Sequence, residues 1–284
     1  MIVVMEPEAP DSAIEAVISY LVSAGFDVHR SSGVDRTILG VVGEVTQNDV
    51  GVVRELAGVG EVVRVSEPFR LASKRFRQRA TIVEGAWGNI GGERPWLAIE
   101  PIGFDETAAE LPHVIAAGRP FDAAVVRSRT APESVGALTC LSLHASPSNR
   151  KWHVAFVERA PSWGANKWIG AAERELKRGE GGVVLLEAGG EYPNGARTLE
   201  IAAIARVKIR SHLPIVVDVP VIAQRARYTT AVACAAVAAG ADGVILRAWV
   251  GAEGEVPRVP ATLRWDEAVE LGEKLRQIGV AVRK

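Results

Sequence analysis

Residues 182–250 decide the fold of this chain: GVVLLEAGGEYPNGARTLEIAAIARVKIRSHLPIVVDVPVIAQRARYTTAVACAAVAAGADGVILRAWV. Continuous apolar runs in this stretch are typical of strands buried on both faces, and amphipathic segments separate them. The runs are GVVLLEAG, PIVVDVP and DGVILRAWV, and the helical segments are TLEIAAIARVKIR and YTTAVACAAVAAG. Buried strands that alternate with helices predict a parallel sheet covered by helices, either doubly wound or closed into a barrel.

The same alternation extends over residues 96–284. Further strands are expected at WLAIE, FDAAVVRS and WHVAFVE, and further helices at DETAAELPHVIAAG, ANKWIGAAERELKRG and WDEAVELGEKLRQIG. This length is at the lower limit of an eight-stranded βα barrel, so a (β/α)8-type TIM barrel here would be abbreviated. ALTCLSLH at 137–144 also has the pattern of a strand, but it lies too close to its neighbours for a parallel crossover. We expect it to be an antiparallel excursion or the remnant of a deletion.

The first 67 residues follow a different pattern. Strand and helix signals alternate there in the order β-α-β-β-α-β, which is typical of a ferredoxin-like α+β domain. Residues 68–95 combine a basic run, RLASKRFRQR, with the glycine-rich WGNIGGERP, and predict a linker with a short hairpin. The expected organisation is therefore a small domain at 1–67, a linker at 68–95 and a degenerate barrel domain at 96–284.

Composition excludes several classes of function. A net charge of −1 favours neither nucleic acid nor an anionic membrane as a partner. The sequence contains no apolar run of membrane-spanning length and no signal peptide pattern at its start, which favours a cytoplasmic protein. Cys140 and Cys234 lie in apolar surroundings without metal-ligand spacing and are expected to be buried thiols.

Residues 1–74 resemble the regulatory domain of the 3-deoxy-7-phosphoheptulonate (DAHP) synthases that carry an N-terminal ferredoxin-like domain. The resemblance lies in MIVVM, GFDVHRSSGVDRTILGVVG and VVRVSEPFRLAS, and in the barrel half in PIVVDVP, AVAAGADGVIL and the Arg129-Thr130 pair. It implies a TIM-barrel enzyme of the shikimate pathway, an aldol-type transferase that condenses phosphoenolpyruvate with erythrose 4-phosphate for aromatic amino acid biosynthesis.

The metal site implied by the resemblance differs in this sequence. The family holds a divalent metal with Cys, His, Glu and Asp, but Ile102, Val221 and Arg247 stand at three of these positions. Isoleucine and valine have no ligand atom, and arginine repels a cation. Only Glu253 or Glu255 remains as a replacement ligand. We therefore expect no metal, no other cofactor and no residual DAHP synthase activity, as in a pseudoenzyme.

The implied substrate site has changed as well. Glu158-Arg159-Ala160 and Leu186-Glu187-Ala188 replace family motifs that supply cations. The resemblance leaves Arg129, Thr130 and Arg159 as candidates for holding an anion at the carboxyl ends of the strands. The candidate catalytic residues are Arg129, Arg159, Glu187, Asp218 and Arg247. Ordinary salt bridges at strand ends are an equally good interpretation of these residues.

The implied regulatory site is better preserved. In the family, an aromatic amino acid binds between paired N-terminal domains, and the contact residues correspond here to His29 and Ser31. Two hypotheses follow. The first is a catalytically degenerate homologue that acts as an allosterically regulated, aromatic-amino-acid-responsive regulator or scaffold, with a DAHP synthase or chorismate mutase as a possible partner. The second is a diverged, metal-independent barrel enzyme for a phosphorylated or carboxylated small molecule. An incomplete barrel exposes apolar edges, so a homodimer or homotetramer is expected.

Overall fold

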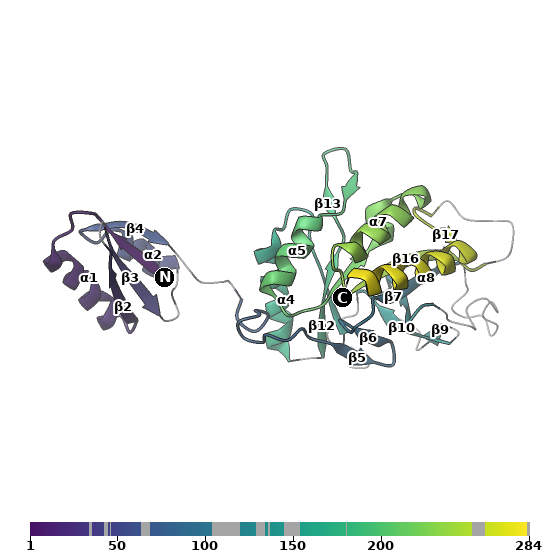
Figure 1. Cartoon of the computed structure of the whole chain (residues 1–284), viewed down its shortest axis with the longest axis horizontal. Helices are drawn as coiled ribbons and strands as arrows, with labels where there is room; N and C mark the ends of the chain where they lie inside the picture. The colour runs from purple at the N-terminus through teal and green to yellow at the C-terminus, as the bar shows by residue number, and fades with distance from the viewer. Residues whose placement is uncertain are drawn as a thin grey trace. The chain divides into compact units, whose positions relative to one another are not determined.

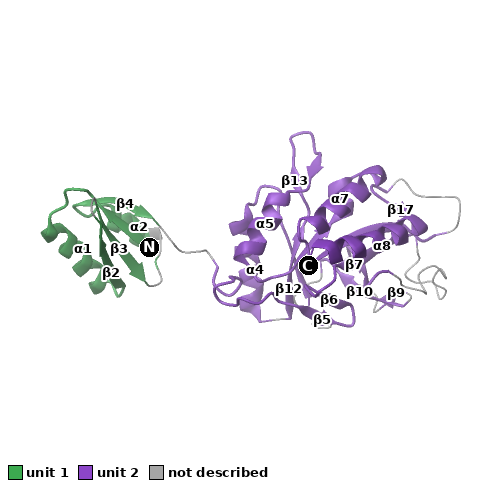
Figure 2. Ribbon diagram, in the orientation of Figure 1, with its two compact units in different colours: residues 1–67 green, residues 68–284 purple. Residues whose placement is uncertain are grey.

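The computed structural model forms two compact units, residues 1–67 (unit 1) and residues 68–284 (unit 2) (Figure 2). The structure describes residues 1–33, 36–42, 45, 47–63, 69–103, 120–128, 134–135, 137–144, 154–179, 181–251 and 259–282. The helix expected at 105–118 therefore lies outside the described residues. Within the described ranges, no helix combines the length and the apolar character needed to cross a membrane.

Unit 1 confirms the expected ferredoxin-like fold. Its elements are β1 (Ile2–Met5), α1 (Asp11–Ser23), β2 (Asp27–Ser32), β3 (Thr37–Val42), α2 (Gln47–Arg54) and β4 (Val59–Val63). The strands pair in the antiparallel order β2-β3-β1-β4. Alternate residues such as Val3, Leu39 and Val62 are buried in one apolar cluster with Ile14 and Leu21 of α1. Because strand side chains alternate between faces, the helices cover one face of this sheet only.

The described residues of unit 2 form a mixed sheet of nine strands. They are β7 (Trp96–Ile102), β8 (Ala123–Val126), β9 (Ser134–Val135), β10 (Leu138–Ser142), β11 (Val154–Glu158), β12 (Gly182–Glu187), β15 (Ile215–Asp218), β16 (Gly243–Trp249) and β17 (Leu263–Arg264). Neighbours follow the order β11-β12-β15-β16-β7-β8-β10-β9, and β17 pairs with β16. The late strand β16 thus lies parallel to the early strand β7, a pairing that curls the sheet as in a TIM barrel. The predicted α/β barrel class is confirmed.

Helices cover the outer face of the curled sheet (Figure 1). They are α4 (Ala165–Arg178), α5 (Ile201–Arg210), α6 (Val219–Ala223), α7 (Ala226–Ala238) and α8 (Trp265–Val282). The described part of unit 2 also contains two short hairpins: β5 (Val83–Gly85) pairs with β6 (Gly88–Ile90), and β13 (Gly190–Glu191) pairs with β14 (Arg197–Thr198).

The strand predicted at 137–144 is present as β10. Of the two explanations offered for it, an antiparallel excursion or the remnant of a deletion, the first is wrong. It pairs parallel to β8, with Cys140 opposite Ala124, so it is not an antiparallel excursion. The antiparallel segment is β9, which pairs with β10 on the side away from β8. β9 spans two residues shortly before β10, and most of the connection from β8 to β9 lies outside the described residues.

Two apolar layers fix the orientation of the strand side chains. The outer layer packs the sheet against the helices and includes Leu97, Ile99 and Val217. The inner layer fills the barrel interior with the alternate residues of the same strands, such as Ala98 and Val216. It also contains the following β5–β6 residues: Val83, Trp87 and Ile90. The hairpin therefore packs into the inner layer, next to the first residues of the strands, and leaves the carboxyl ends for other side chains.

The basic segment after residue 68 is attached to unit 2 by its backbone. Lys74 N donates to Arg210 O at 2.8 Å, and Thr81 N donates to His212 O at 2.7 Å. The His212 ring contacts Leu71 O through Nε2 at 2.6 Å and Thr81 Oγ1 through Nδ1 at 2.7 Å. Burial lowers the pKa of His212 from its ordinary value of 6.5. A neutral ring that donates from Nε2 satisfies both contacts.

Candidate active site

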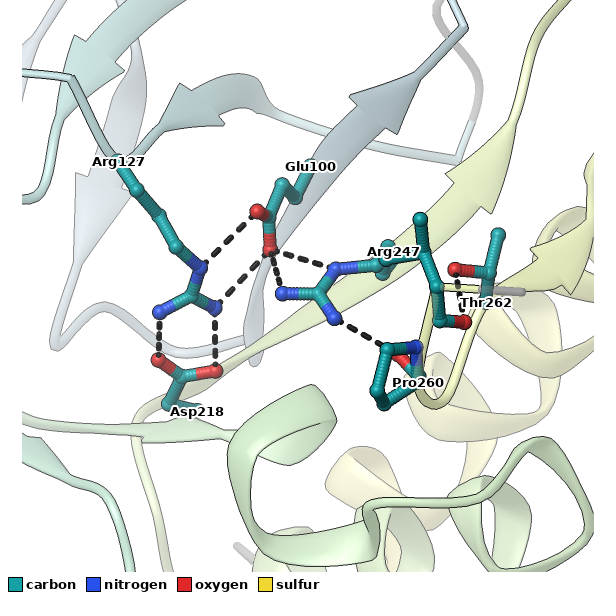
Figure 3. Close-up of polar contacts among 7 residues, drawn as sticks. Glu100, Arg127, Asp218, Arg247, Pro260 and Thr262 are labelled. Atoms are coloured by element: carbon teal, nitrogen blue, oxygen red, sulfur yellow. Dashed lines mark hydrogen bonds and ion pairs between the residues drawn. The ribbon is translucent and has the colours of Figure 1, made fainter. Parts of the chain in front are cut away.

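A layer of charged side chains lies inside the carboxyl ends of four neighbouring strands of unit 2 (Figure 3). Its members are Glu100 on β7, Arg127 directly after β8, Asp218 at the end of β15 and Arg247 on β16. Each follows an inner-layer residue of its own strand by two positions: Ala98, Val125, Val216 and Ile245. The two-residue period of a strand therefore places all four on the interior face. We call these four residues the mouth cluster.

Arg127 is the centre of the mouth cluster. Its Nε and Nη2 donate to the two carboxylate oxygens of Glu100 at 2.9 and 3.0 Å. Its Nη1 and Nη2 donate to the two carboxylate oxygens of Asp218, each at 2.9 Å. One guanidinium thus holds two carboxylates in the bidentate geometry that gives strong, directional pairing.

Arg247 completes the cluster from the other side of Glu100. Its Nε donates to Glu100 Oε2 at 3.0 Å, and its Nη2 lies 2.9 Å from the same oxygen. Its Nη1 donates to the carbonyl of Pro260 at 2.7 Å. The next residue, Ala261, has a φ of 56°, a conformation that costs a non-glycine residue about 1 kcal/mol or more. Strain is therefore stored in the turn that presents the Pro260 carbonyl to Arg247.

The mouth cluster is buried and electrically balanced. The exposed fractions of the side chains are 8% for Glu100, 2% for Asp218, 10% for Arg247 and 29% for Arg127. Burial opposes the charge of Arg127, but hydrogen bonds and attraction from Asp218 and Glu100 outweigh it and raise the pKa of its guanidinium. Two cations thus neutralise two carboxylates at one end of the barrel, and only Arg127 keeps substantial contact with solvent.

The mouth cluster does not fit a divalent metal. Both oxygens of Glu100 and both oxygens of Asp218 already accept hydrogen bonds from guanidinium groups. Unit charges 4 Å apart interact by about 4 kcal/mol at an effective dielectric constant of about 20, and a divalent cation doubles that repulsion from each arginine. Among the residues that the structure describes, no three His, Cys, Asp or Glu side chains converge. Glu253 and Glu255 lie outside the described residues.

Arg159 and Glu187 form a second, separate pair. Arg159 Nε and Nη2 donate to Glu187 at 2.5 and 2.6 Å, and Nη1 donates to Trp163 O at 3.1 Å. Both side chains are almost completely buried, at 1% and 0% exposed. They follow the outer-layer residues Val157 and Leu185 by two positions, so they point away from the barrel interior.

The structure thus divides the residues that the sequence put forward. Asp218 and Arg247 meet in the mouth cluster, Arg159 and Glu187 meet elsewhere, and Arg129 and Thr130 lie outside the described residues. Sequence reasoning missed Glu100 and Arg127 as members. The signal was present, because WLAIE and FDAAVVRS place both on the same strand face as alanine and valine residues of the interior.

His29 and Ser31 lie on β2, two residues apart. The residue between them, Arg30, turns to α1, where it pairs with Asp11 at 2.7 Å and with Glu15 at 3.0 Å. Alternation therefore places His29 and Ser31 on the face of the sheet that the helices of unit 1 leave open. Exposed apolar residues of the same sheet accompany them: Ile38, Val42 and Val63.

Comparison with known proteins identifies relatives of both units. The family model of the DAHP synthase ferredoxin-like domain matches residues 1–67. A phospho-2-dehydro-3-deoxyheptonate aldolase of Thermotoga maritima is 22% identical over 333 residues, which cover 99% of this chain and 98% of that protein.

Solved structures show the same likeness. A crystal structure of a phospho-2-dehydro-3-deoxyheptonate aldolase (DAHP synthase) of Thermotoga maritima matches with a TM-score of 0.73 at 21% identity, over 99% of this chain and 98% of that one. A truncated 3-deoxy-D-arabino-heptulosonate 7-phosphate synthase of the same organism matches with a TM-score of 0.63 at 18% identity. The match covers 76% of this chain and 98% of that one.

These relatives correct the function predicted from sequence. The hypothesis of a catalytically degenerate regulator or scaffold is wrong, because the chain matches an aldolase from end to end and not through its regulatory domain alone. Nothing in the comparisons points to a different substrate class. The hypothesis rested on short matching segments in which implied metal ligands are replaced by other residues. Such segments do not reveal which side chains lie together at the barrel mouth.

Proposed function

We propose that the chain, which matches the DAHP synthase ferredoxin-like domain over residues 1–67 and resembles an aldolase over its whole length, is itself an aldol-type synthase. In this proposal it condenses phosphoenolpyruvate with erythrose 4-phosphate. The observation that carries the proposal is the match to an aldolase over both units. The position of the mouth cluster supports it, because βα barrels carry out their chemistry at the carboxyl ends of the strands.

The mouth cluster offers groups suited to such a condensation. In such a condensation, C3 of phosphoenolpyruvate bonds to the aldehyde carbon, water adds to C2, and the C2–phosphate bond breaks to release phosphate. Negative charge develops on the aldehyde oxygen, and the proton that reaches this oxygen comes from the added water. Arg127 faces solvent in part and is a fixed cation that stabilises developing negative charge. Asp218, held in place by Arg127, is the carboxylate that we assign to accepting the proton of the added water and passing it to the aldehyde oxygen.

The test is a condensation assay on the purified full chain with phosphoenolpyruvate and erythrose 4-phosphate. We expect release of inorganic phosphate, and we expect Asp218→Asn to lower kcat by roughly 10²-fold to 10³-fold because the oriented carboxylate is lost. Asp266→Asn is the matched control, since that side chain is 77% exposed at the start of α8. The proposal fails if a well-folded wild-type chain releases no phosphate, or if both variants lose activity equally.

We also propose that the open face of the unit 1 sheet binds an aromatic amino acid, with His29 and Ser31 as contact residues. Ser31 lies opposite the exposed Ile38 of β3, and His29 lies opposite Gly40. This placement supports the proposal, because the ring of an aromatic amino acid requires apolar surface, and its ammonium and carboxylate groups require polar partners.

Phenylalanine or tyrosine is expected to bind the full chain and to raise its melting temperature. At a concentration one hundred times the Kd, a ligand of the folded state adds about 2.7 kcal/mol of stability. Calorimetric titration of His29→Ala and Ser31→Ala is expected to show at least tenfold weaker binding. His144→Ala, a change at an exposed histidine of unit 2, serves as the control. Equal affinity in all four proteins would rule out this site.

A further inference from the structure

We infer that Arg127 and Arg247 are the permanent cations of the barrel mouth and stand in place of a divalent cation between Glu100 and Asp218. The inference rests on the proposed function only in its claim that this mouth is the reaction site. It assigns to the two guanidinium groups the charge that would otherwise come from a bound ion.

The hydrogen bonds of the cluster support this assignment. A divalent cation between Glu100 and Asp218 would need carboxylate oxygens that now accept from Arg127. Arg127 cannot release one carboxylate and keep the other without loss, because its Nη2 donates to both. The bidentate pairing therefore makes the cluster resistant to the partial opening that ion entry requires.

Arg247 is fixed as firmly as Arg127. Its Nη1 is held by the carbonyl of Pro260, and its side chain is only 10% exposed. The strained conformation of Ala261 belongs to the same turn, and such strain persists where the surroundings demand one geometry. A guanidinium so held cannot swing away from Glu100 to make room for a metal.

The ligand that suits such a mouth is a small molecule with a carbonyl, carboxylate or phosphate oxygen. Arg127 is the member of the cluster that reaches solvent, so it is the group that first meets an incoming anion. Both cations are side chains of the protein. The positive charge at the barrel mouth is therefore expected to be the same in every molecule and independent of the concentration of free metal.

The experiment is a calorimetric Mn²⁺ titration of the full chain with and without Glu100→Gln or Asp218→Asn. We expect neither variant to change the number or affinity of Mn²⁺ ions bound by the wild-type chain, and we expect the same melting temperature in EDTA and in Mn²⁺. One bound Mn²⁺ per chain that either substitution weakens tenfold or more would overturn the inference.

A gain-of-binding variant provides an independent measurement. Arg247→Glu removes one cation and adds a third carboxylate beside Glu100, so Mn²⁺ affinity is expected to rise at least tenfold over wild type. Arg264→Glu makes the same charge change at a side chain that is 68% exposed and should leave affinity unchanged. If Arg247→Glu does not fold, the titration of the wild-type chain still decides the matter.

These measurements require no turnover. A chain without condensation activity would contradict the proposed function and leave the Mn²⁺ result standing. An active chain whose phosphate release stops in EDTA would contradict the inference alone.

Discussion

Replacing Arg127 with methionine is expected to lower the free energy of unfolding of unit 2 by about 3 kcal/mol. Removing one partner of a buried ion pair costs roughly 3–5 kcal/mol, because the charge left behind is uncompensated. Arg127 holds two buried carboxylates, Glu100 and Asp218, but its own side chain is 29% exposed, which favours the lower end of that range. Urea unfolding followed by tryptophan fluorescence measures the loss in unit 2 specifically, since all seven tryptophans belong to it.

The double variant Arg127→Met/Asp218→Asn tests the cause of the loss. Neutralising one of the two stranded carboxylates should restore part of the lost stability, so the two changes together should cost less than their sum. The control is Arg94→Met, because Arg94 pairs with Asp122 at 2.9 Å but is 71% exposed. An exposed pair contributes at most about 1 kcal/mol. A similar loss at both arginines would show that the mouth cluster has no special role in stability.

Much of the fold follows from patterns in the sequence. Continuous apolar runs identify the strands of unit 2, and strand and helix periods identify unit 1, because burial on one or both faces leaves a direct trace in residue order. β10 shows the limit of this reasoning. The short connection argued against a parallel strand, yet β10 pairs parallel to β8, and the two-residue strand β9 precedes it in antiparallel pairing.

The candidate site was only half accessible from sequence. Arg159, Glu187 and Asp218 all lie at the carboxyl ends of strands, so the resemblance placed all three among the candidate catalytic residues. One residue of difference in register separates them: Asp218 shares the inner face with Val216, and Glu187 shares the outer face with Leu185. Because side chains alternate, a residue one position further along the strand belongs to a different site. Comparison of strand faces, rather than of motif positions, would have found Glu100.

The expected loss of activity rested on the identity of the residues at the implied ligand positions, without the contacts that these residues make. Arg247 does stand at a position where the family resemblance implies a metal ligand, and it lies in a cluster with its own cations and carboxylates. The absence of a ligand in one position does not establish the absence of a reaction, since charge at the mouth can come from the chain itself. The contacts of Arg247, and not its identity alone, indicate which charges are present at the barrel mouth.

The second large effect is expected at the buried pair of Arg159 and Glu187. Replacing Arg159 with methionine should cost about 3–5 kcal/mol, because Glu187 is fully buried and would lose two short hydrogen bonds. Glu187→Gln should cost a comparable amount, since it leaves the buried guanidinium uncompensated and weakens the bond from Gly189 N, which is 2.7 Å long. Urea unfolding of unit 2 is again the measurement.

The double variant Arg159→Met/Glu187→Leu separates the role of charge from the role of packing. A buried ion pair replaced by apolar residues of similar volume is often neutral in stability, so the double variant should be more stable than either single one. Full recovery is not expected, because the Trp163 carbonyl and Gly189 N lose their partners in this variant. If Arg159→Met and the double variant were equally unstable, packing of the arginine against Trp168, whose ring centroid lies 6.0 Å from the guanidinium carbon, would be the dominant contribution of this side chain. Because the pair points away from the mouth cluster, none of these changes should alter the affinity for an anionic substrate in chains that remain folded.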